Sequence, residues 1–472
     1  MTHEEQDAPQ SYRDLLRLRT FRTLWMSQTL SQTAKNGIHF VQVVMIDRLT
    51  HSSSHVGIMI LAFTIPAVIF SALSGIVVDR FSRKRIMIWS NALRILTALS
   101  YVFALTFLHG RSLLLWIYLI TFCSSALGQF FGPALAAVIP QHVPKRALLL
   151  ANSLFNITLI ATQIFGLLVV FPLVIKVGQA LFGVDGGLKL AFLVIALMYA
   201  IATWLLTTIP PDQPPRLVGG TASWRKTVRD FREGWAYIRR LPVLWVPLIN
   251  LTLTALTIMI MALLAPGFAA RVLHVNQEDA VYIFAPAGAG LFLGTVLIGR
   301  YGGRWRRETL SNTGLVLIGV ALGALGLAGW QAQAAQRLVI LMTSAISFVL
   351  GGGFAMVGIP SQTMLQERTT PHMRGRVFAA QFMAANIVGM PPMLLAGWLA
   401  DHFGIPTVAV LVGILVLVVA TITVALAHRY HFVPTGIAGF GRDGALPPHA
   451  TGATSADVGW ETEVKQEAKR EL

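Results

Sequence analysis

The chain has 472 residues, of which 55% are hydrophobic and 12% are charged, and its single cysteine excludes an internal disulfide. Soluble domains carry about 25% charged residues, so this composition excludes a soluble multidomain protein. The net charge of +16 does not indicate nucleic-acid binding here, because basic residues in short loops set the orientation of membrane helices.

Apolar runs of about 20 residues recur along nearly the whole chain and predict membrane-spanning helices. We expect an all-α membrane protein with twelve spans, at residues 22–46, 55–79, 86–108, 112–139, 147–175, 187–209, 243–270, 280–299, 309–330, 337–364, 376–400 and 405–427. With a cytoplasmic N-terminus, 29 of the 37 Lys and Arg residues fall in cytoplasmic segments and 6 in external loops. This bias predicts a multi-pass protein of the cell membrane with both termini cytoplasmic.

The middle of the chain predicts two pseudo-symmetric six-helix bundles. Pro133 and Pro144 near the end of the fourth span match Pro360 and Pro371 near the end of the tenth, as in transporters built from repeats. The expected domains are a cytoplasmic tail (1–21), a first bundle (22–209), a cytoplasmic linker (210–242), a second bundle (243–428) and a disordered cytoplasmic tail (429–472). Within the linker, apolar residues at helical spacing predict an amphipathic helix that lies on the membrane surface or packs on a bundle; they are Trp224, Val228, Phe231, Trp235 and Ile238.

The first span carries five polar residues at steps of four and three, so they share one helical face: Gln28, Gln32, Lys35, His39 and Gln42. Polar side chains at membrane depth are costly, so we expect this stripe to line a central cavity; the alternative is a polar seam packed against another helix. Lys35 could be neutral, pair with an acid or attract an anionic substrate. No Asp or Glu stands free at membrane depth, which makes His39 the best candidate for proton coupling.

Further cavity candidates lie on other spans. Arg94, in the third span, could line the cavity or extend to the cytoplasmic surface. Asn152, Asn156 and Gln163 share one face of the fifth span. The remaining candidates are Gln129, Asn250, Gln381 and Asn386. Glycines at 288–294 and 351–353 lie within spans and indicate close helix packing.

The loop from Gly75 to Arg85 predicts a conformational gate. Gly75 allows a close helix approach, and Asp79 is suited to accept hydrogen bonds from a helix N-terminus. The other members of the expected gate are Arg80 and Arg83 in this loop and Glu367, Arg374 and Arg376 in the second half. The last three are expected to form the charged cluster that faces Asp79.

This loop resembles the signature loop of the major facilitator superfamily. Further matches resemble its drug-exporter-like branch, which includes the enterobactin exporter and macrolide efflux proteins; they are Phe21, Arg22 and Trp25, the stretch 49–54, Ile65 and Pro66, Gly132 and Pro133 through Asn152, Glu233 and Gly234, and the stretch 365–377. The resemblance implies alternating-access transport, with Asp79 holding the two halves together on the cytoplasmic side. Relatives carry a small or acidic residue near position 35, so Lys35 argues against a carboxylate proton relay.

The sequence therefore predicts a secondary transporter that exports small amphipathic or drug-like molecules, a multidrug antiporter coupled to protons. The alternatives are a facilitator or importer of a lipid or siderophore, and a transport-inactive scaffold or sensor. The expected partners are a small-molecule substrate, protons and the lipid bilayer, with no nucleic acid, and the chain is expected to be a monomer. No catalytic or metal-binding motif occurs, so we expect neither an enzyme nor a cofactor.

Overall fold

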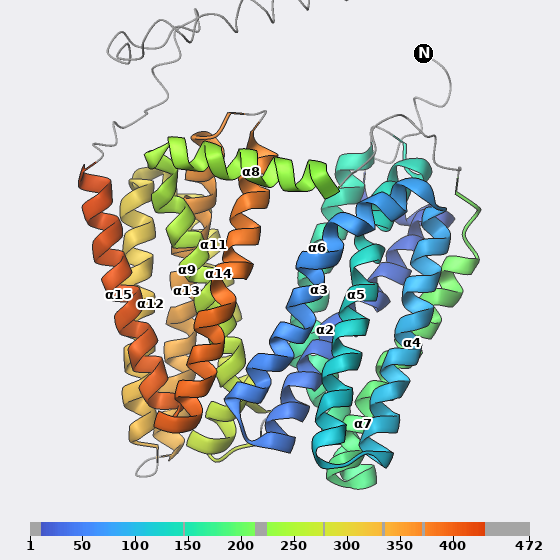
Figure 1. The fold of residues 1–472 in the computed structure, drawn as a ribbon, viewed down its shortest axis with the longest axis horizontal. Coiled ribbons are helices and arrows are strands. Elements are labelled where there is room, and N and C mark those ends of the chain that lie inside the picture. The colour runs from blue at the N-terminus through green and yellow to red at the C-terminus, as the bar shows by residue number, and fades with distance from the viewer. Residues whose placement is uncertain are drawn as a thin grey trace, which may run out of the picture. The chain divides into compact units, whose positions relative to one another are not determined.

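Helices follow one another along almost the whole chain in the computed structural model (Figure 1), which describes residues 11–144, 147–212, 224–276, 279–332, 336–370 and 373–429. Within these ranges no residue belongs to a strand. A membrane offers no water to an unpaired backbone group, and a helix satisfies its own backbone internally. The uninterrupted helical pattern follows from that constraint.

The first half begins with a short helix, α1 (Tyr12–Arg17), followed by four long ones: α2 (Arg19–Thr50), α3 (Ser53–Arg80), α4 (Arg83–Phe107) and α5 (Gly110–His142). The next helices are α6 (Leu148–Phe165), a π-helical turn η3 (Gly166–Val170) and α7 (Phe171–Thr207). Inside α7, Gly183 has a φ of 79°, which side-chain-bearing residues rarely adopt. The chain reverses there, so α7 holds the end of the predicted fifth span and the whole of the sixth.

The second half begins with α8 (Trp224–Arg240), η4 (Pro242–Leu244), α9 (Trp245–Gly267) and the π-helical turn η5 (Phe268–Val272). It continues with α10 (Ala280–Phe284), α11 (Pro286–Tyr301), η7 (Gly302–Arg304) and α12 (Arg307–Trp330). The last three helices are α13 (Gln336–Glu367), α14 (Arg374–Phe403) and α15 (Ile405–Arg429).

Ten helical stretches among the described residues are long and apolar enough to cross a membrane. The two other predicted spans are helical too. The first, α2, is 32 residues long and carries the polar stripe, which lowers its hydropathy. The second is divided by η3, and its later part, Phe171–Gly183, is a shorter apolar helix. The predicted fold class, twelve membrane helices in two six-helix bundles, is confirmed (Figure 1).

The two bundles pack by different means. In the first, the rings of Tyr101 and Phe192 stack with centroids 4.5 Å apart between α4 and α7. In the second, a Cβ added at Gly290 would collide with the carbonyl of Phe348, and one at Gly351 with that of Ala287. Of the glycines predicted to permit close packing, Gly290 and Gly351 therefore bring α11 and α13 into backbone contact, where dispersion forces act most strongly. A Cβ added at Gly288 would meet no atom within 4 Å, so the prediction is wrong for that glycine.

Helix α8 lies across one end of the second bundle (Figure 1), which we call the α8 end; the opposite end is the far end. Ile238 of α8 is fully buried, and the rings of Trp235 and Trp245 meet edge to face at 5.9 Å. Of the two interpretations of this helix, packing on a bundle therefore holds for its described C-terminal half. The side chains of Trp224, Val228 and Phe231 lie outside the described residues.

Candidate functional site

At the far end, one arginine of the second bundle reaches the turn between the first two long helices. Arg271 of η5 donates from Nη1 to the carbonyl of His51 and from Nη2 to Oγ of Ser53, the latter at 2.8 Å. Its nitrogens lie 3.3 Å from Oδ1 of Asp47 and 3.6 Å from Oδ1 of Asp401. Asp47 is 1% exposed, whereas the side chain of Arg271 is 28% exposed, so water and salt reach the ion pair only from the arginine side.

Asp401, near the end of α14, caps the first turn of α3. Its Oδ1 accepts from the backbone N–H of Ser53 at 2.7 Å, and its Oδ2 accepts from Oγ of Ser52 at 2.6 Å and from the N–H of Ser54 at 2.9 Å. The free N–H groups and the dipole at a helix N-terminus favour a carboxylate. One turn earlier, a Cβ added at Gly397 would lie 3.0 Å from the carbonyl oxygen of Ser53. The two bundles are therefore in direct contact at the far end.

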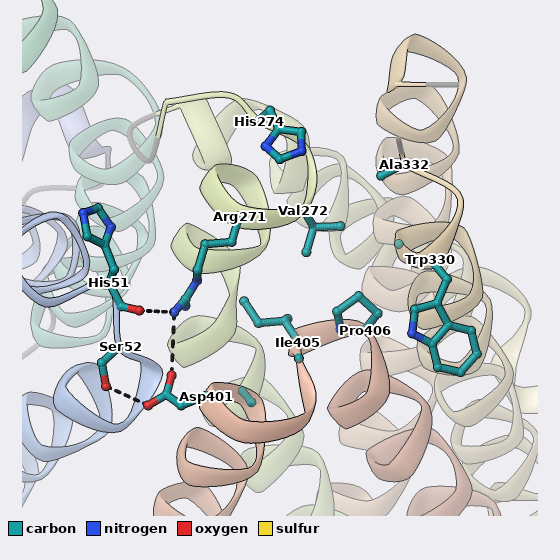
Figure 2. A pocket seen from close by; sticks show the side chains of 13 residues that line it. His51, Ser52, Arg271, Val272, His274, Trp330, Ala332, Asp401, Ile405 and Pro406 are labelled. Atoms are coloured by element: carbon teal, nitrogen blue, oxygen red, sulfur yellow. Dashed lines mark hydrogen bonds and ion pairs between the residues drawn. The ribbon is translucent and has the colours of Figure 1, made fainter. Parts of the chain in front are cut away.

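A pocket of about 610 Å³ lies beside this contact and is shown in Figure 2. His51, Ser52, Arg271 and Asp401 line one side, with His274, Trp330 and Pro406 on the other. A further pair of charges joins the halves, between Nζ of Lys176 and Oδ1 of Asp279, at 2.5 Å. We call Asp47, Ser53, Arg271 and Asp401 the far-end clamp.

At the α8 end, Glu367, Arg374 and Arg376 each have at least one partner in their own half among the described residues. Glu367 pairs with Arg307, and Arg376 pairs with Glu233 of α8 at 2.7 Å. Arg374 donates from Nε to the carbonyls of Gln366 and Thr369.

The first-half gate residues are placed differently from the prediction. A Cβ added at Gly75 would meet no atom within 4 Å, so the close approach predicted at this glycine is wrong for this conformation. Arg80 is exposed, and the backbone N–H of Arg83 donates to Asp212 at 2.6 Å at the start of α4. The side chain of Asp79 lies outside the described residues.

The polar stripe of α2 divides into two parts. Gln28 and Gln42 are buried, and Nε2 of Gln42 donates to the hydroxyls of Tyr101 at 2.5 Å and Thr121 at 3.3 Å. These two glutamines form a packed seam. Gln32, Lys35 and His39 are partly exposed, and the ring of His39 lies 4.4 Å from that of Phe63.

Arg94 lies inside the first bundle rather than at its surface. It is 3% exposed, and its guanidinium carbon lies 5.3 Å from the ring centroid of Tyr199, a cation–π distance. A Cβ added at Gly128 would collide with the Arg94 guanidinium, so the glycine makes room for the charge. One turn earlier, Asn91 donates to Oγ of Ser31 at 2.8 Å.

The other predicted cavity residues are placed separately. Asn152, Asn156 and Gln163 are exposed on α6. Gln129, Gln381 and Asn386 are partly exposed, and Gln129 and Asn386 donate to carbonyls one turn earlier on their own helices. Among the residues that the structure describes, no hydrogen bond joins any of these six side chains to Lys35 or His39.

Asn250 is completely buried and donates to Oγ of Ser311 at 2.8 Å, joining α9 to α12. The Asn91–Ser31 pair joins α4 to α2 in the same way. In the first half the serine is on the first span (α2) and the asparagine on the third (α4). In the second half the asparagine is on the first span (α9) and the serine on the third (α12). This placement supports the pseudo-symmetry of the halves and gives Asn250 a packing contact inside the second bundle.

The far-end clamp was missed by the sequence reasoning. The sequence does contain a signal for this clamp. Asp47, Arg271 and Asp401 all fall at predicted external ends of spans, and the charge of the arginine is opposite to that of the two aspartates. The sequence does not show which of several terminal charges meet, since residues 47, 271 and 401 come together through the packing of two bundles.

Two bundles of membrane helices, tied together at one end and carrying a polar face at mid-depth on α2, define the chain as a membrane transport protein. The family model described as Major Facilitator Superfamily matches residues 24–391. The chain belongs to this superfamily, as the loop at 75–85 indicated.

Two relatives match along most of their length. The chain is 25% identical to the MFS-type transporter YfiS of Bacillus subtilis (strain 168) over 423 residues, 86% of this chain and 94% of that protein. It is 23% identical to macrolide efflux protein A of Streptococcus pyogenes over 416 residues, 85% of this chain and 94% of the relative. These matches are consistent with the predicted drug-exporter-like branch.

Solved structures share the fold. The nucleoside transporter NupG has a TM-score of 0.65 at 14% identity and covers 86% of this chain and 98% of its own. A bacterial homologue of the human lysosomal transporter Spinster, in an inward-facing and unoccupied conformation, has a TM-score of 0.63 at 17% identity and covers 87% and 96%.

Proposed function

We propose that this protein is a secondary transporter of the cell membrane that exports small amphipathic or drug-like molecules by alternating access, coupled to protons. The observation that carries the proposal is the contrast between the two ends. The far-end clamp joins the bundles across the halves, whereas Glu367, Arg374 and Arg376 at the α8 end bind within their own half and α8. Alternating access requires a state in which the bundles are joined at the far end and a second state in which they are joined at the α8 end.

In this proposal the α8 end is cytoplasmic and the far end is external. The bias of Lys and Arg supports this orientation, because the basic loops of residues 80–85 and 300–307 lie at the α8 end of their helices. The state described is then open toward the cytoplasm, the state in which an exporter receives its substrate.

The loop of residues 75–85 then acts in the opposite state. The open space at Gly75 allows a helix of the second half to approach when the α8 end closes. Asp79 would then meet the charges of Glu367, Arg374 and Arg376, or a helix N-terminus beside them. Opening the far end requires the far-end clamp to break.

For the coupling step we propose His39. It is partly exposed on the polar stripe beside Lys35, and its Nδ1 is a buried atom without a hydrogen-bond partner. An imidazole exchanges its proton near neutral pH in water, and substrate bound at Gln32, Lys35 and His39 would change the affinity of His39 for that proton. The similarity to macrolide efflux protein A supports export as the direction.

A second candidate, a facilitator that needs no proton gradient, is favoured by the acidic residues. Residues 243–428 contain five of them, Glu278, Asp279, Glu308, Glu367 and Asp401. The four that the structure describes lie at or beside helix ends, and Glu278 lies outside the described residues. Carboxylates within transmembrane segments are common proton carriers in pumps and transporters. A carboxylate relay through the middle of the second bundle is therefore unavailable.

Transport in sealed vesicles tests these candidates. The purified protein, reconstituted with its α8 end on a known side, is supplied with fluorescent amphipathic probes, with and without an imposed pH gradient. We expect probe movement that the gradient accelerates. Movement that is unchanged when the gradient collapses would identify a facilitator, and an inert protein that inserts correctly would favour the scaffold.

A His39→Gln variant tests the proposed proton carrier. It should move the probe at a rate that no longer responds to the gradient. An unaltered response would exclude His39.

A further inference from the structure

Two cationic residues, Lys35 and Arg94, lie near the middle of their helices in the first bundle. Lys35 lies at the centre of α2, and Arg94 of α4 is close enough to interact with it electrostatically. Like charges repel, and the buried setting of Arg94 gives little solvent screening. The arrangement therefore costs free energy unless an anion lies nearby.

The described carboxylates do not supply that anion. Residues 22–209 contain three acidic residues, Asp47, Asp79 and Asp185. Asp47 lies in the far-end clamp, Asp185 is exposed beside the turn at Gly183, and Asp79 belongs to the last turn of α3. Among the described side chains, no carboxylate oxygen lies within 4.0 Å of a nitrogen of Lys35 or Arg94.

The hydrogen bonds of this region are also incomplete. Nε of Arg94 and Nδ2 of Asn36 are buried donors without a partner. A partly satisfied polar network is costly at low dielectric, because a buried unpaired donor keeps its desolvation penalty. Tyr199 and Gly128 hold the guanidinium in place without neutralising it. Two positive charges and the free donor of Arg94 match an acceptor-rich, negatively charged group.

We propose that the transported molecule is an amphipathic organic anion, whose carboxylate, sulfonate or phosphate group binds between Lys35 and Arg94. This inference rests on the proposed transport function and names its substrate class. Arg94 binds the charged group from inside the bundle, and partly exposed Lys35 binds it on the side from which it enters. The apolar body lies along α2 toward the aromatic pair of His39 and Phe63. Cationic drugs are excluded by the same two charges.

Matched probes separate charge from hydrophobicity. 8-Anilinonaphthalene-1-sulfonate is an anion, N-phenyl-1-naphthylamine is its neutral counterpart without the sulfonate, and ethidium is a cation. Equilibrium binding to the full chain in lipid nanodiscs is measured for each, with empty nanodiscs subtracted, and inorganic sulfate is tested as a competitor. We expect the sulfonate probe to bind about tenfold or more tightly than its neutral counterpart. Inorganic sulfate should compete weakly.

Variants assign the binding to the two cations. Lys35→Met and Arg94→Gln should each weaken sulfonate binding about tenfold and leave the neutral probe unchanged. Lys35→Arg and Arg94→Lys, which keep the charge, should retain most of the affinity. Arg111→Gln, which removes an exposed cation outside the bundle, serves as the control and should match the wild type. Each variant is first shown to keep the wild-type melting temperature within a few degrees.

The outcomes separate this inference from the transport function. Preferred binding or movement of ethidium or the neutral probe, or equal sulfonate binding by Lys35→Met and Arg94→Gln, would overturn the inference while leaving transport intact. Inorganic sulfate that competes as well as the organic anion would assign the charges to a resident inorganic ion and would also overturn it. Sulfonate binding that needs both cations, in a protein that moves no probe across vesicles, would keep the inference and remove the transport function.

Discussion

Charged side chains lie at both ends of this protein, but they join the two bundles at the far end and have partners in their own half at the α8 end. At the far end, Asp401 of one bundle caps a helix of the other, and Arg271 bonds the adjoining turn. At the α8 end, the corresponding charges pair with neighbours on their own side, as Glu367 does with Arg307. A glycine without a close neighbour, Gly75, lies at the α8 end, and a tightly packed one, Gly397, lies at the far end.

This difference teaches how a transporter keeps one side closed without fixing the whole molecule. A charge and a helix N-terminus bind strongly at short range and lose most of their interaction within a Debye length of water. The contact therefore acts as an on–off element. At the far end, Gly397 lacks the side chain that would prevent the two bundles from meeting.

The largest effect is expected from Arg271→Met, which removes the central cation of the far-end clamp. Asp47 is 1% exposed and would lose this partner, a change of about 3 kcal/mol in favour of far-end opening. The measurement is the labelling rate of a Met393→Cys thiol by an impermeant maleimide in a Cys123→Ser background, since Met393 is fully buried in this state. We expect labelling to accelerate at least tenfold, with Arg271→Lys intermediate. Equal labelling rates in the wild-type protein, Arg271→Lys and Arg271→Met would show that the clamp does not hold the far end closed.

A matched pair of glycine substitutions comes next and compares the two ends directly. Gly397→Val places methyl groups against Ser53, and overpacking of this kind costs about 1–3 kcal/mol. A Cβ at Gly75 meets no atom within 4 Å in this state, so Gly75→Val should leave the melting temperature nearly unchanged. It should still slow transport, because the α8 end could no longer close. A Gly75→Val variant that transports at the wild-type rate would contradict the role of this glycine.

A smaller change is expected from Asp401→Asn, which keeps the shape of the cap and removes its charge. The amide has a single acceptor oxygen, so it keeps the bond to the N–H of Ser53 or the bond to the N–H of Ser54, which the carboxylate accepts on different oxygens. We expect a loss of about 1 kcal/mol from the missing bond, the dipole and the Arg271 ion pair. The same thiol-labelling rate measures it, and the acceleration should be several-fold. Asp401→Ala, which removes the cap entirely, should exceed it; the reverse order would show that Asp401 does not act as a cap.

Much of the fold could be predicted from the sequence, because hydropathy and the positive-inside bias are local signals that each span carries by itself. The family resemblance followed from the loop at 75–85 for the same reason. The contacts of the candidate site were harder to predict from the sequence. The spacing of Gln28 and Gln42 places them on one face of α2. It does not show that Gln42 donates hydrogen bonds to the hydroxyls of Tyr101 and Thr121 inside the bundle. The partners of Asp401 and Arg271 depend on how the two bundles pack against each other, and no local pattern encodes that packing.

The smallest effect is expected at the α8 end, from Arg376→Gln. Its pair with Glu233 is partly exposed, at 29% and 40%, and such pairs contribute about 0.2–1 kcal/mol. The melting temperature should therefore fall by a few degrees at most, and the Met393→Cys labelling rate should not change, since the far end is intact. High salt should reduce the difference from the wild type further, because exposed charges are screened. A loss as large as that of Arg271→Met would mean that both ends hold this state together, and the contrast between them would have to be abandoned.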